Sequence, residues 1–140
     1  MPNPEGAWIG VDPGTRYVGV AVGDAASKVA APLKVLDAKP EPALMRALVR
    51  IASEHGARGF VVGLPLNMDG SESAGCKSAR AFATKLAETA KLPVHLVDER
   101  LSSFEAEGRL IEGGLKPSER RMRVHAVSAA LLLEAFFSST

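Results

Sequence analysis

The chain has 140 residues, of which 46% are hydrophobic and 24% are charged. A chain of this size forms a single core, so we expect one domain over residues 1–140, which argues against a two-domain enzyme. Seventeen Lys and Arg residues against sixteen Asp and Glu residues leave a net charge of +1. Any nucleic-acid partner would therefore be held by a local basic patch, because the whole chain carries almost no net charge.

Cysteine usage and hydropathy favour a cytoplasmic location. The single cysteine, Cys76, can form neither an internal disulfide nor a cysteine-based zinc site. The first residues lack the basic start and apolar run of a signal peptide. The longest apolar stretch, residues 124–137, is too short to cross a bilayer and contains His125 and Glu134. We expect a cytoplasmic protein that is not inserted in a membrane.

The first part of the chain is typical of antiparallel strands. Residues 8–12 and 17–22 are β-branched runs joined by a short turn containing Gly14, which predicts a hairpin. Residues 29–37 predict a third strand. Because Pro32 has no N–H to donate, this strand is expected to lie at a sheet edge or to bend at the proline.

From Pro42 onwards, helical and extended patterns alternate. Apolar spacing and turn signals predict four helices. The first covers residues 41–55, and the second follows the 65–75 loop and ends near Leu92. The third is a short helix from Ser102 to Gly113, and the last begins at His125 and ends near Phe137. Apolar runs at 59–64 and 94–97 predict two buried strands. This order indicates an α/β fold: a mixed five-stranded sheet, its first three strands antiparallel, with helices on both faces.

Acidic residues follow two of the expected strands, at the sheet end where sites form in α/β folds. Asp12 ends the first strand, and Asp98 and Glu99 follow the last one. A carboxylate there is costly unless it is hydrogen-bonded, paired or metal-bound. The plainer alternatives are a turn aspartate at Asp12 and a solvated strand end in which Arg100 pairs with Asp98 and Glu99.

His125 shares a helix face with Ala129, Leu132 and Phe136, which favours a histidine in or beside the core. It gains a chemical role only if Asp12 and Glu99 lie nearby, because two carboxylates and an imidazole can bind a divalent metal ion. In the 65–75 loop, the side chains of Asn67 and Asp69 could bind a ligand, although Asp69 and Gly70 also form an ordinary turn pair. Cys76 is interpreted as an inert packing residue.

A basic segment precedes and enters the last helix. Its cations outnumber Glu112 and Glu119 by three, and they are Arg109, Lys116, Arg120, Arg121 and Arg123. This excess could hold a phosphate backbone, or it could be a solvated loop and helix face. Aromatic residues make up only 5% of the chain, which argues against a platform of stacked bases.

Four segments together resemble the YqgF/RuvX family of pre-16S ribosomal RNA nucleases, which is related to RuvC-type Holliday junction resolvases. They are DPGTRYVGVAVG at 12–23, VGLPLNMDG at 62–70, DERLSSFEA at 98–106 and RMRVHAVSAALLLE at 121–134. The resemblance implies a ribonuclease H-like fold. It also implies a nuclease that hydrolyses phosphodiester bonds in structured nucleic acid, by 5′-end processing of pre-16S ribosomal RNA, resolution of Holliday junctions, or both.

The resemblance further implies Mg²⁺ or Mn²⁺ held by Asp12 and Glu99, as one ion or as a pair about 4 Å apart. Asp98 would be an adjacent ligand or support. His125 occupies a position that is usually Asp in the family, and it is kept as the third metal ligand. Arg16 and Arg100 would either position phosphates or orient the acids. The basic segment of residues 109–123 would be a further candidate for phosphate contact.

Two alternatives remain. The first is a nucleic-acid-binding module that does not cleave, which the histidine at position 125 and the small net charge favour. The second is an ATP-binding domain of the actin and sugar-kinase type, against which the chain length argues, since that architecture needs two such domains. A homodimer would be required for symmetrical cutting of a junction, but no motif identifies a dimer surface.

Overall fold

The computed structural model describes residues 6–99 and 117–139. In chain order, the elements are strands β1 (Ala7–Pro13), β2 (Tyr17–Asp24) and β3 (Val29–Asp37), helix α1 (Glu41–His55), strand β4 (Phe60–Leu64), helix α2 (Ala74–Ala90), strand β5 (Val94–Asp98) and helix α4 (Pro117–Ser138). The strands form one sheet in the order β3-β2-β1-β4-β5. The short helix expected from Ser102 to Gly113 lies outside the described residues.

The predicted hairpin and third strand are confirmed. β1 and β2 pair antiparallel from Ala7 opposite Asp24 to Pro13 opposite Val18, and β2 pairs antiparallel with β3. β3 lies at the edge of the sheet, and its register with β2 shifts between Val20 and Ala21, next to Pro32. The proline therefore sits where a missing N–H disturbs the fewest ladder hydrogen bonds.

The second half of the sheet is parallel. β4 pairs with β1 and with β5 in parallel, so the sheet is mixed, as predicted. β4 is central and buried from Phe60 to Gly63, which confirms the buried strand. The prediction that 94–97 is also buried is wrong: β5 is the other edge strand, and its residues are half-buried or exposed. An apolar run alone does not distinguish an edge strand from a central one.

Both helices between the parallel strands end as their sequences predict. α1 begins with Pro42 in its first turn and ends at Gly56, whose φ of 60° is left-handed. α2 ends at Lys91, also left-handed, two residues before Pro93. These ends turn the chain back into β4 and β5, whose carboxyl ends then lie beside that of β1.

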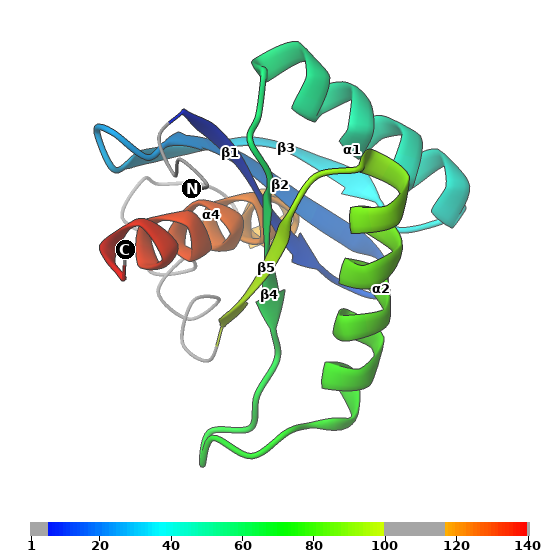
Figure 1. The fold of residues 1–140 in the computed structure, drawn as a ribbon. Coiled ribbons are helices and arrows are strands. Elements are labelled where there is room, and N and C mark those ends of the chain that lie inside the picture. The colour runs from blue at the N-terminus through cyan, green and yellow to red at the C-terminus, as the bar shows by residue number, and fades with distance from the viewer. Residues whose placement is uncertain (1–5, 100–116, 140) are drawn as a thin grey trace.

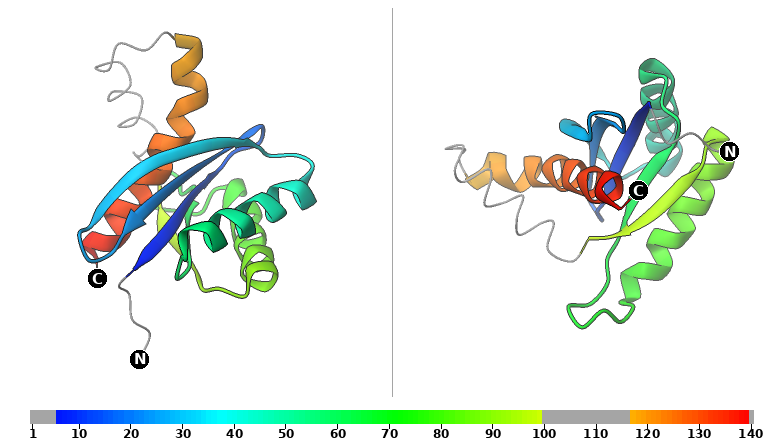
Figure 2. Two further views of the ribbon diagram at one scale, coloured as in Figure 1. Left: turned by 90° about the horizontal axis from the view of Figure 1, so that it is seen from above. Right: turned by 60° about the vertical axis from the view of Figure 1, so that its left-hand side comes forward.

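Helices cover both faces of the sheet, as predicted. α1 and α2 lie on one face and α4 lies across the other (Figures 1 and 2). The first core lies between the sheet and α1 and α2, and its large side chains include Ile9, Leu48, Phe60 and Leu86. The second lies between the sheet and α4, and it includes Trp8, Val61, Leu132 and Phe137.

The last helix is longer than its apolar pattern indicates. α4 begins at Pro117, a residue type suited to a first turn, so His125 lies inside the helix and does not begin it. Arg120, Arg121 and Arg123 belong to its first two turns. Over the described residues, no helix is long and apolar enough to span a membrane.

Candidate functional site

Asp12 points to the α4 face of the sheet. Side chains alternate along β1, so Ile9 and Val11 enter the core under α1 and α2, whereas Trp8 and Asp12 lie on the opposite face. Asp12 is only 5% exposed. A carboxylate this deeply buried requires a hydrogen-bonding, ionic or metal partner.

Glu99 lies on the same face. On β5, Val94 and Leu96 pack into the first core and Val97 packs into the second, so the alternation places Glu99 on the α4 side. Its Oε2 atom is buried against β4, because a Cβ atom at Gly63 would lie only 2.4 Å from it. The carboxyl ends of β1, β4 and β5 thus bring Asp12 and Glu99 together across Gly63.

The closeness of the two carboxyl groups changes the pKa of Glu99. Burial, which has the largest effect, a side-chain hydrogen bond with Asp12 and the negative charges of Asp12 and Asp98 together raise this pKa from 4.5 to about 9. Two carboxylates at this distance repel each other unless a proton or a cation lies between them. The pair is therefore a site of unusual affinity for positive charge.

His125 reaches the same place from α4. Its Nδ1 atom lies 3.4 Å from Oδ2 of Asp12, and its side chain is 29% exposed. The ring also packs at a tilted angle beside Tyr17, with 6.3 Å between the ring centroids. The expectation of a histidine at the edge of the core is confirmed, and the ring also lies beside Asp12.

Glycines that were not predicted as part of the site make this approach possible. A Cβ atom at Gly19, which faces Asp12 on β2, would lie 1.9 Å from the main-chain oxygen of His125. A Cβ atom at Gly10 would lie 2.5 Å from the main-chain oxygen of Ala129. Glycine inside a strand often marks close backbone approach, and that signal could have identified both residues.

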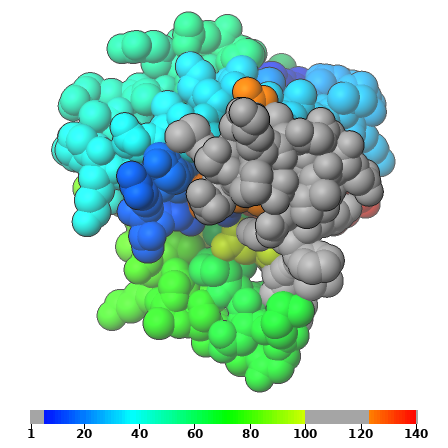
Figure 3. Space-filling model, turned by 180° about the vertical axis from the view of Figure 1, so that it is seen from behind, coloured from blue at the N-terminus to red at the C-terminus, as the bar shows by residue number. Residues whose placement is uncertain are grey.

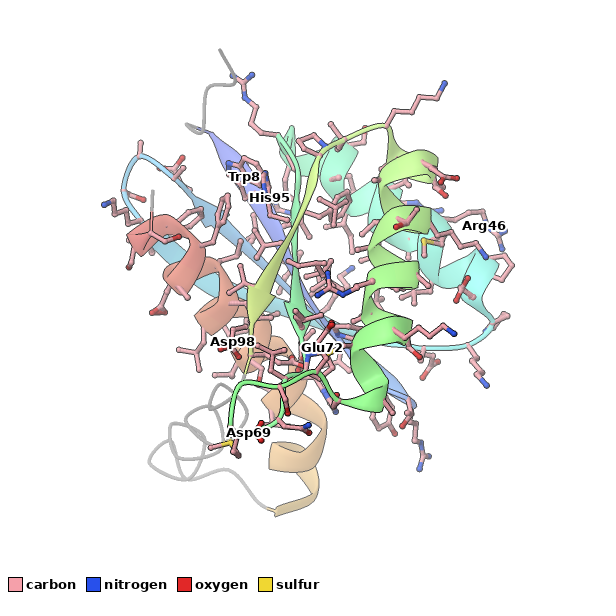
Figure 4. The ribbon with its side chains drawn as sticks, turned by 60° about the horizontal axis from the view of Figure 1, so that its bottom comes forward. Trp8, Arg46, Asp69, Glu72, His95 and Asp98 are labelled. Carbon is pink, nitrogen blue, oxygen red and sulfur yellow. The ribbon has the colours of Figure 1, made fainter. Side chains whose placement is uncertain are left out.

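Asp98 is placed differently from Glu99. It is the last residue of β5, pairs in register with Leu64 and is exposed. In Figure 4, it lies at the end of the sheet near the Asp69 and Glu72 loop, whereas Trp8 and His95 lie together towards the other end of β5. Asp98 therefore contributes negative charge next to Glu99 from a position nearer to solvent.

The donor set fits a hard divalent cation. Asp12 and Glu99 supply carboxylate oxygens, which Mg²⁺ and Mn²⁺ prefer, and His125 supplies a ring nitrogen. Within residues 6–99 and 117–139, however, no three His, Cys, Asp or Glu side chains already form a group that could hold a metal ion. Asp12 and Glu99 would hold such a cation with their carboxylate oxygens, and its charge would offset the repulsion between them.

The predicted basic residues are placed only in part. Arg16 is exposed in the turn between β1 and β2, with its guanidinium 5.2 Å from the centre of the Tyr17 ring. Arg123 is exposed on α4, where it lines a groove beside β3. Arg120 and Arg121 lie on α4 with side chains outside the described part, and Arg100, Arg109 and Lys116 lie outside it altogether.

The 65–73 loop is held by its own side chains. Leu66 and Glu72 form an isolated antiparallel bridge, Asn67 Nδ2 donates to Ser71 Oγ over 3.0 Å, and Asp69 Oδ1 accepts from the N–H of Ser71 over 2.9 Å. Asn67 and Asp69 thus stabilise a turn, the simpler of their two interpretations. Cys76 is 1% exposed at the start of α2, which confirms its packing role.

Comparison with known proteins places these features in context. The family model described as "RuvX: Holliday junction resolvase" matches residues 6–139. A protein of Anaeromyxobacter sp. (strain Fw109-5), named "Putative pre-16S rRNA nuclease", is 43% identical over 92% of this chain and 94% of its own length. Proteins with the same name from Paracoccus denitrificans and Chloroflexus aurantiacus are 41% and 35% identical, over 92% and 94% of this chain and 82% and 86% of their own lengths.

Solved structures share the fold at low sequence identity. The chain resembles Thermus thermophilus RuvC in complex with a Holliday junction substrate, with a TM-score of 0.58 and 17% identity over 95% of this chain and 94% of that one. It also resembles the fowlpox virus resolvase bound to Holliday junction DNA, with a TM-score of 0.54 and 10% identity over 95% and 97% of the chains. The predicted ribonuclease H-like α/β fold is thereby confirmed.

Proposed function

This chain belongs to the RuvX family, and on that premise we propose that it is a metal-dependent nuclease that hydrolyses phosphodiester bonds in structured nucleic acid. The observation that carries the proposal is the meeting of Asp12 and Glu99 at the carboxyl ends of β1 and β5, with His125 of α4 3.4 Å from Asp12. Residues 1–140 would act as one catalytic domain in the cytoplasm.

Asp12 and Glu99 would hold the metal ion. When bound, Mg²⁺ or Mn²⁺ would polarise the scissile phosphate and lower the pKa of the attacking water, singly or as a pair of ions. Glu99 would bind the ion in its carboxylate form, because the charge of the ion would offset the cost of burying the carboxylate beside Asp12. His125 is the proposed third ligand, and Asp98 supports the site from the solvent side.

Exposed cations on the turn after β1 and on α4 would hold the substrate. Arg16 lies four residues after Asp12 in that turn, and Arg123 lies two residues before His125 on α4, in a groove beside β3. Phosphate contacts from such residues fix the position of a backbone without reading its sequence. Arg100, Arg109, Lys116, Arg120 and Arg121 are proposed to extend this contact.

The relatives' name favours pre-16S ribosomal RNA as substrate, and the family description favours a Holliday junction, which is a four-way DNA junction. The second candidate function is a module that binds nucleic acid without cleaving it, since the imidazole of His125 stands where the family's usual ligand is a carboxylate. Symmetrical cutting of a junction would require a homodimer with two sites.

Cleavage of end-labelled pre-16S ribosomal RNA and of a four-way DNA junction, side by side with Mg²⁺ and Mn²⁺, tests the proposal. The wild type is expected to cut at least one of them only when a divalent ion is present, and Asp12→Asn is expected to lose that activity. Glu72→Gln is the matched control, because Glu72 is exposed and bonded to Arg80 on the loop side. Binding of either substrate without cleavage under any divalent ion would select the module instead.

A further inference from the structure

A solvent-open cavity of about 480 Å³ lies on the face of the sheet opposite to α4. Its floor is apolar: Val18, Leu44 and Ala79 are each at most 5% exposed, and the half-buried ring of Phe82 forms one wall. Its rim is polar and includes Thr15 and Ser78. This volume and this combination of apolar walls with few polar groups are typical of sites for small organic ligands.

One turn separates this cavity from the carboxylate site. Pro13, Gly14 and Thr15 line the cavity and follow Asp12 directly in the chain. On the other side of the turn, a Cβ atom at Gly14 would lie 3.2 Å from Cε1 of His125. In Figure 3, the turn between β1 and β2 (blue) lies between the segment that precedes α1 (cyan) and the α2 region (green). The turn of Pro13, Gly14 and Thr15 thus borders the cavity on one side and His125 on the other.

Two cations flank the same turn. The N–H of Ala38 donates to the main-chain oxygen of Arg16 over 2.9 Å, which brings Lys39 beside the turn and onto the cavity rim. Arg16 and Lys39 are both exposed. The Glu41 carboxylate, also on the rim, is bonded to Lys85 Nζ at 2.5 Å. The cavity thus favours a ligand that has a negatively charged group at the mouth and an uncharged group in the apolar interior.

We propose that this cavity, which we call the base pocket, takes one unpaired nucleobase of the substrate strand whose phosphate lies at Asp12 and Glu99. A base has apolar faces that can pack on Phe82 and Leu44, and polar edges that can bond Thr15 and Ser78. Arg16 and Lys39 would hold the phosphates on either side of it. The inference rests on the proposed nuclease function and adds a substrate feature, an unpaired nucleotide beside the cut.

Binding of a mononucleotide to the metal-free full chain tests the pocket without any cleavage. Adenosine and uridine 5′-monophosphate are titrated in EDTA while the amide NMR shifts of Gly14, Thr15 and Ser78 are followed. Saturable shifts are expected, and Ala79→Leu is expected to weaken binding at least about tenfold by filling the pocket. Ala83→Leu is the matched control, because Ala83 lies one turn further along α2 and lines a different groove. Ser78→Leu serves as a second filling variant if Ala79→Leu fails to fold.

A second arm distinguishes a base within a strand from a free nucleotide. An abasic residue is placed beside the cut in an oligonucleotide substrate, and the dissociation constants of wild type and Ala79→Leu are compared. The abasic site is expected to weaken binding at least about tenfold to the wild type and to leave binding to Ala79→Leu unchanged. Equal losses in both proteins would overturn the proposal in favour of a free-nucleotide site.

The two proposals fail in different ways. Suppose that wild type cleaves nucleic acid and that Ala79→Leu binds mononucleotides as tightly as Ala83→Leu does. This outcome would overturn the base pocket and leave the nuclease proposal intact. Saturable shifts at Gly14, Thr15 and Ser78 that Ala79→Leu abolishes would support the pocket even in a protein that binds nucleic acid but does not cut it. Absence of any shift at these residues with both nucleotides would overturn the pocket.

Discussion

Nδ1 of His125 lies 3.4 Å from Oδ2 of Asp12, across 113 positions of the chain and between a helix and the central part of the sheet. The contact orients the imidazole, because a ring nitrogen facing a carboxylate fixes which nitrogen carries the proton. It also explains why the α4 face of β1 and β2 contains Gly10 and Gly19. Those positions let the helix backbone approach closely enough for His125 to touch Asp12.

Replacing His125 tests whether its ring contributes to metal binding. His125→Ala is expected to lower the cleavage rate by about 10- to 100-fold, the usual cost of losing a group next to a metal. His125→Asp is expected to restore much of the rate and to raise the ratio of Mg²⁺ to Mn²⁺ activity, because a carboxylate suits Mg²⁺ better than an imidazole does. Cleavage rates with each ion measure both effects.

His95→Ala is the control for this series. His95 is exposed on β5, away from Asp98, and packs against Trp8 with 5.6 Å between ring centroids (Figure 4). Its removal should leave the cleavage rate and the metal preference unchanged. Equal rates in His125→Ala and wild type would show that His125 packs against Asp12 without serving the reaction.

The stability of the metal-free protein should depend on Glu99 and on pH. Because the pKa of Glu99 is about 9 in the folded protein and 4.5 ordinarily, the folded state binds more protons between these values. Stability therefore falls as pH rises from 5 to 8, and Glu99→Gln removes this dependence. Urea unfolding in EDTA at three pH values measures this effect. The midpoint urea concentration of Glu99→Gln should rise relative to that of wild type as the pH increases.

Glu72→Gln is the control, since Glu72 is exposed. Its urea midpoints should run parallel to those of wild type. Added Mn²⁺ should stabilise wild type at pH 8 and leave Glu99→Gln almost unaffected, because the ion takes the place of the lost proton. Parallel curves for wild type and Glu99→Gln in EDTA would show that Glu99 titrates normally.

Gly63→Ala should displace the Glu99 carboxyl group. The new Cβ atom would lie 2.4 Å from Oε2 of Glu99 and 3.0 Å from Cδ1 of Leu132. We expect a loss of stability of about 1–3 kcal/mol from overpacking, together with weaker Mn²⁺ binding. Urea unfolding and Mn²⁺ titration measure the two effects separately.

Gly59→Ala is the control that separates the general cost of overpacking from displacement of the Glu99 carboxyl group. Its Cβ atom would meet Pro93 O and Trp8 Cζ3, each at 2.6 Å, but at the amino end of β4. It should lose stability to a similar extent and keep its Mn²⁺ affinity. If both variants keep wild-type affinity, the position of Glu99 against Gly63 does not matter for metal binding.

Gly19→Ala should push α4 away from the sheet. The added methyl group would overlap the main chain of α4 at His125, 1.9 Å from its oxygen, and a helix backbone cannot move aside locally. A loss of about 3 kcal/mol is expected in urea unfolding. Gly56→Ala meets nothing within 4 Å and should lose only about 1 kcal/mol, from its left-handed φ. Equal losses would indicate that α4 repacks freely.

The sequence predicts the sheet well because its signals are local. The turn after Asp12, Pro32 and the helix ends at Gly56 and Pro93 each act within a few residues, and they place every described strand. The exposure of β5 and the start of α4 at Pro117 were not predicted. The exposure of β5 depends on which strand lies at the sheet edge, and the start of α4 depends on what supports its polar end. An apolar pattern contains neither kind of information.

The candidate site, too, could be predicted only in part from the sequence. Asp12 and Glu99 could be identified because acids at the carboxyl ends of strands mark the sheet end where sites form, and the strand order then brings them together. A glycine inside a strand signals close approach at Gly19 and Gly63, but the group that approaches, the His125 backbone or the Glu99 carboxyl group, depends on the fold. The 3.4 Å contact of His125 likewise requires the crossing of α4 over β1 and β2, which no local pattern specifies.

Binding of Mn²⁺ to the metal-free protein, followed by electron paramagnetic resonance, tests most directly the claim that Asp12 and Glu99 hold a divalent ion together. Wild type and Glu72→Gln are expected to bind Mn²⁺ saturably at neutral pH, whereas Asp12→Asn and Glu99→Gln each lose more than about 100-fold in affinity. Wild-type affinity in either of these two variants would contradict the account, because the ion would then be held elsewhere.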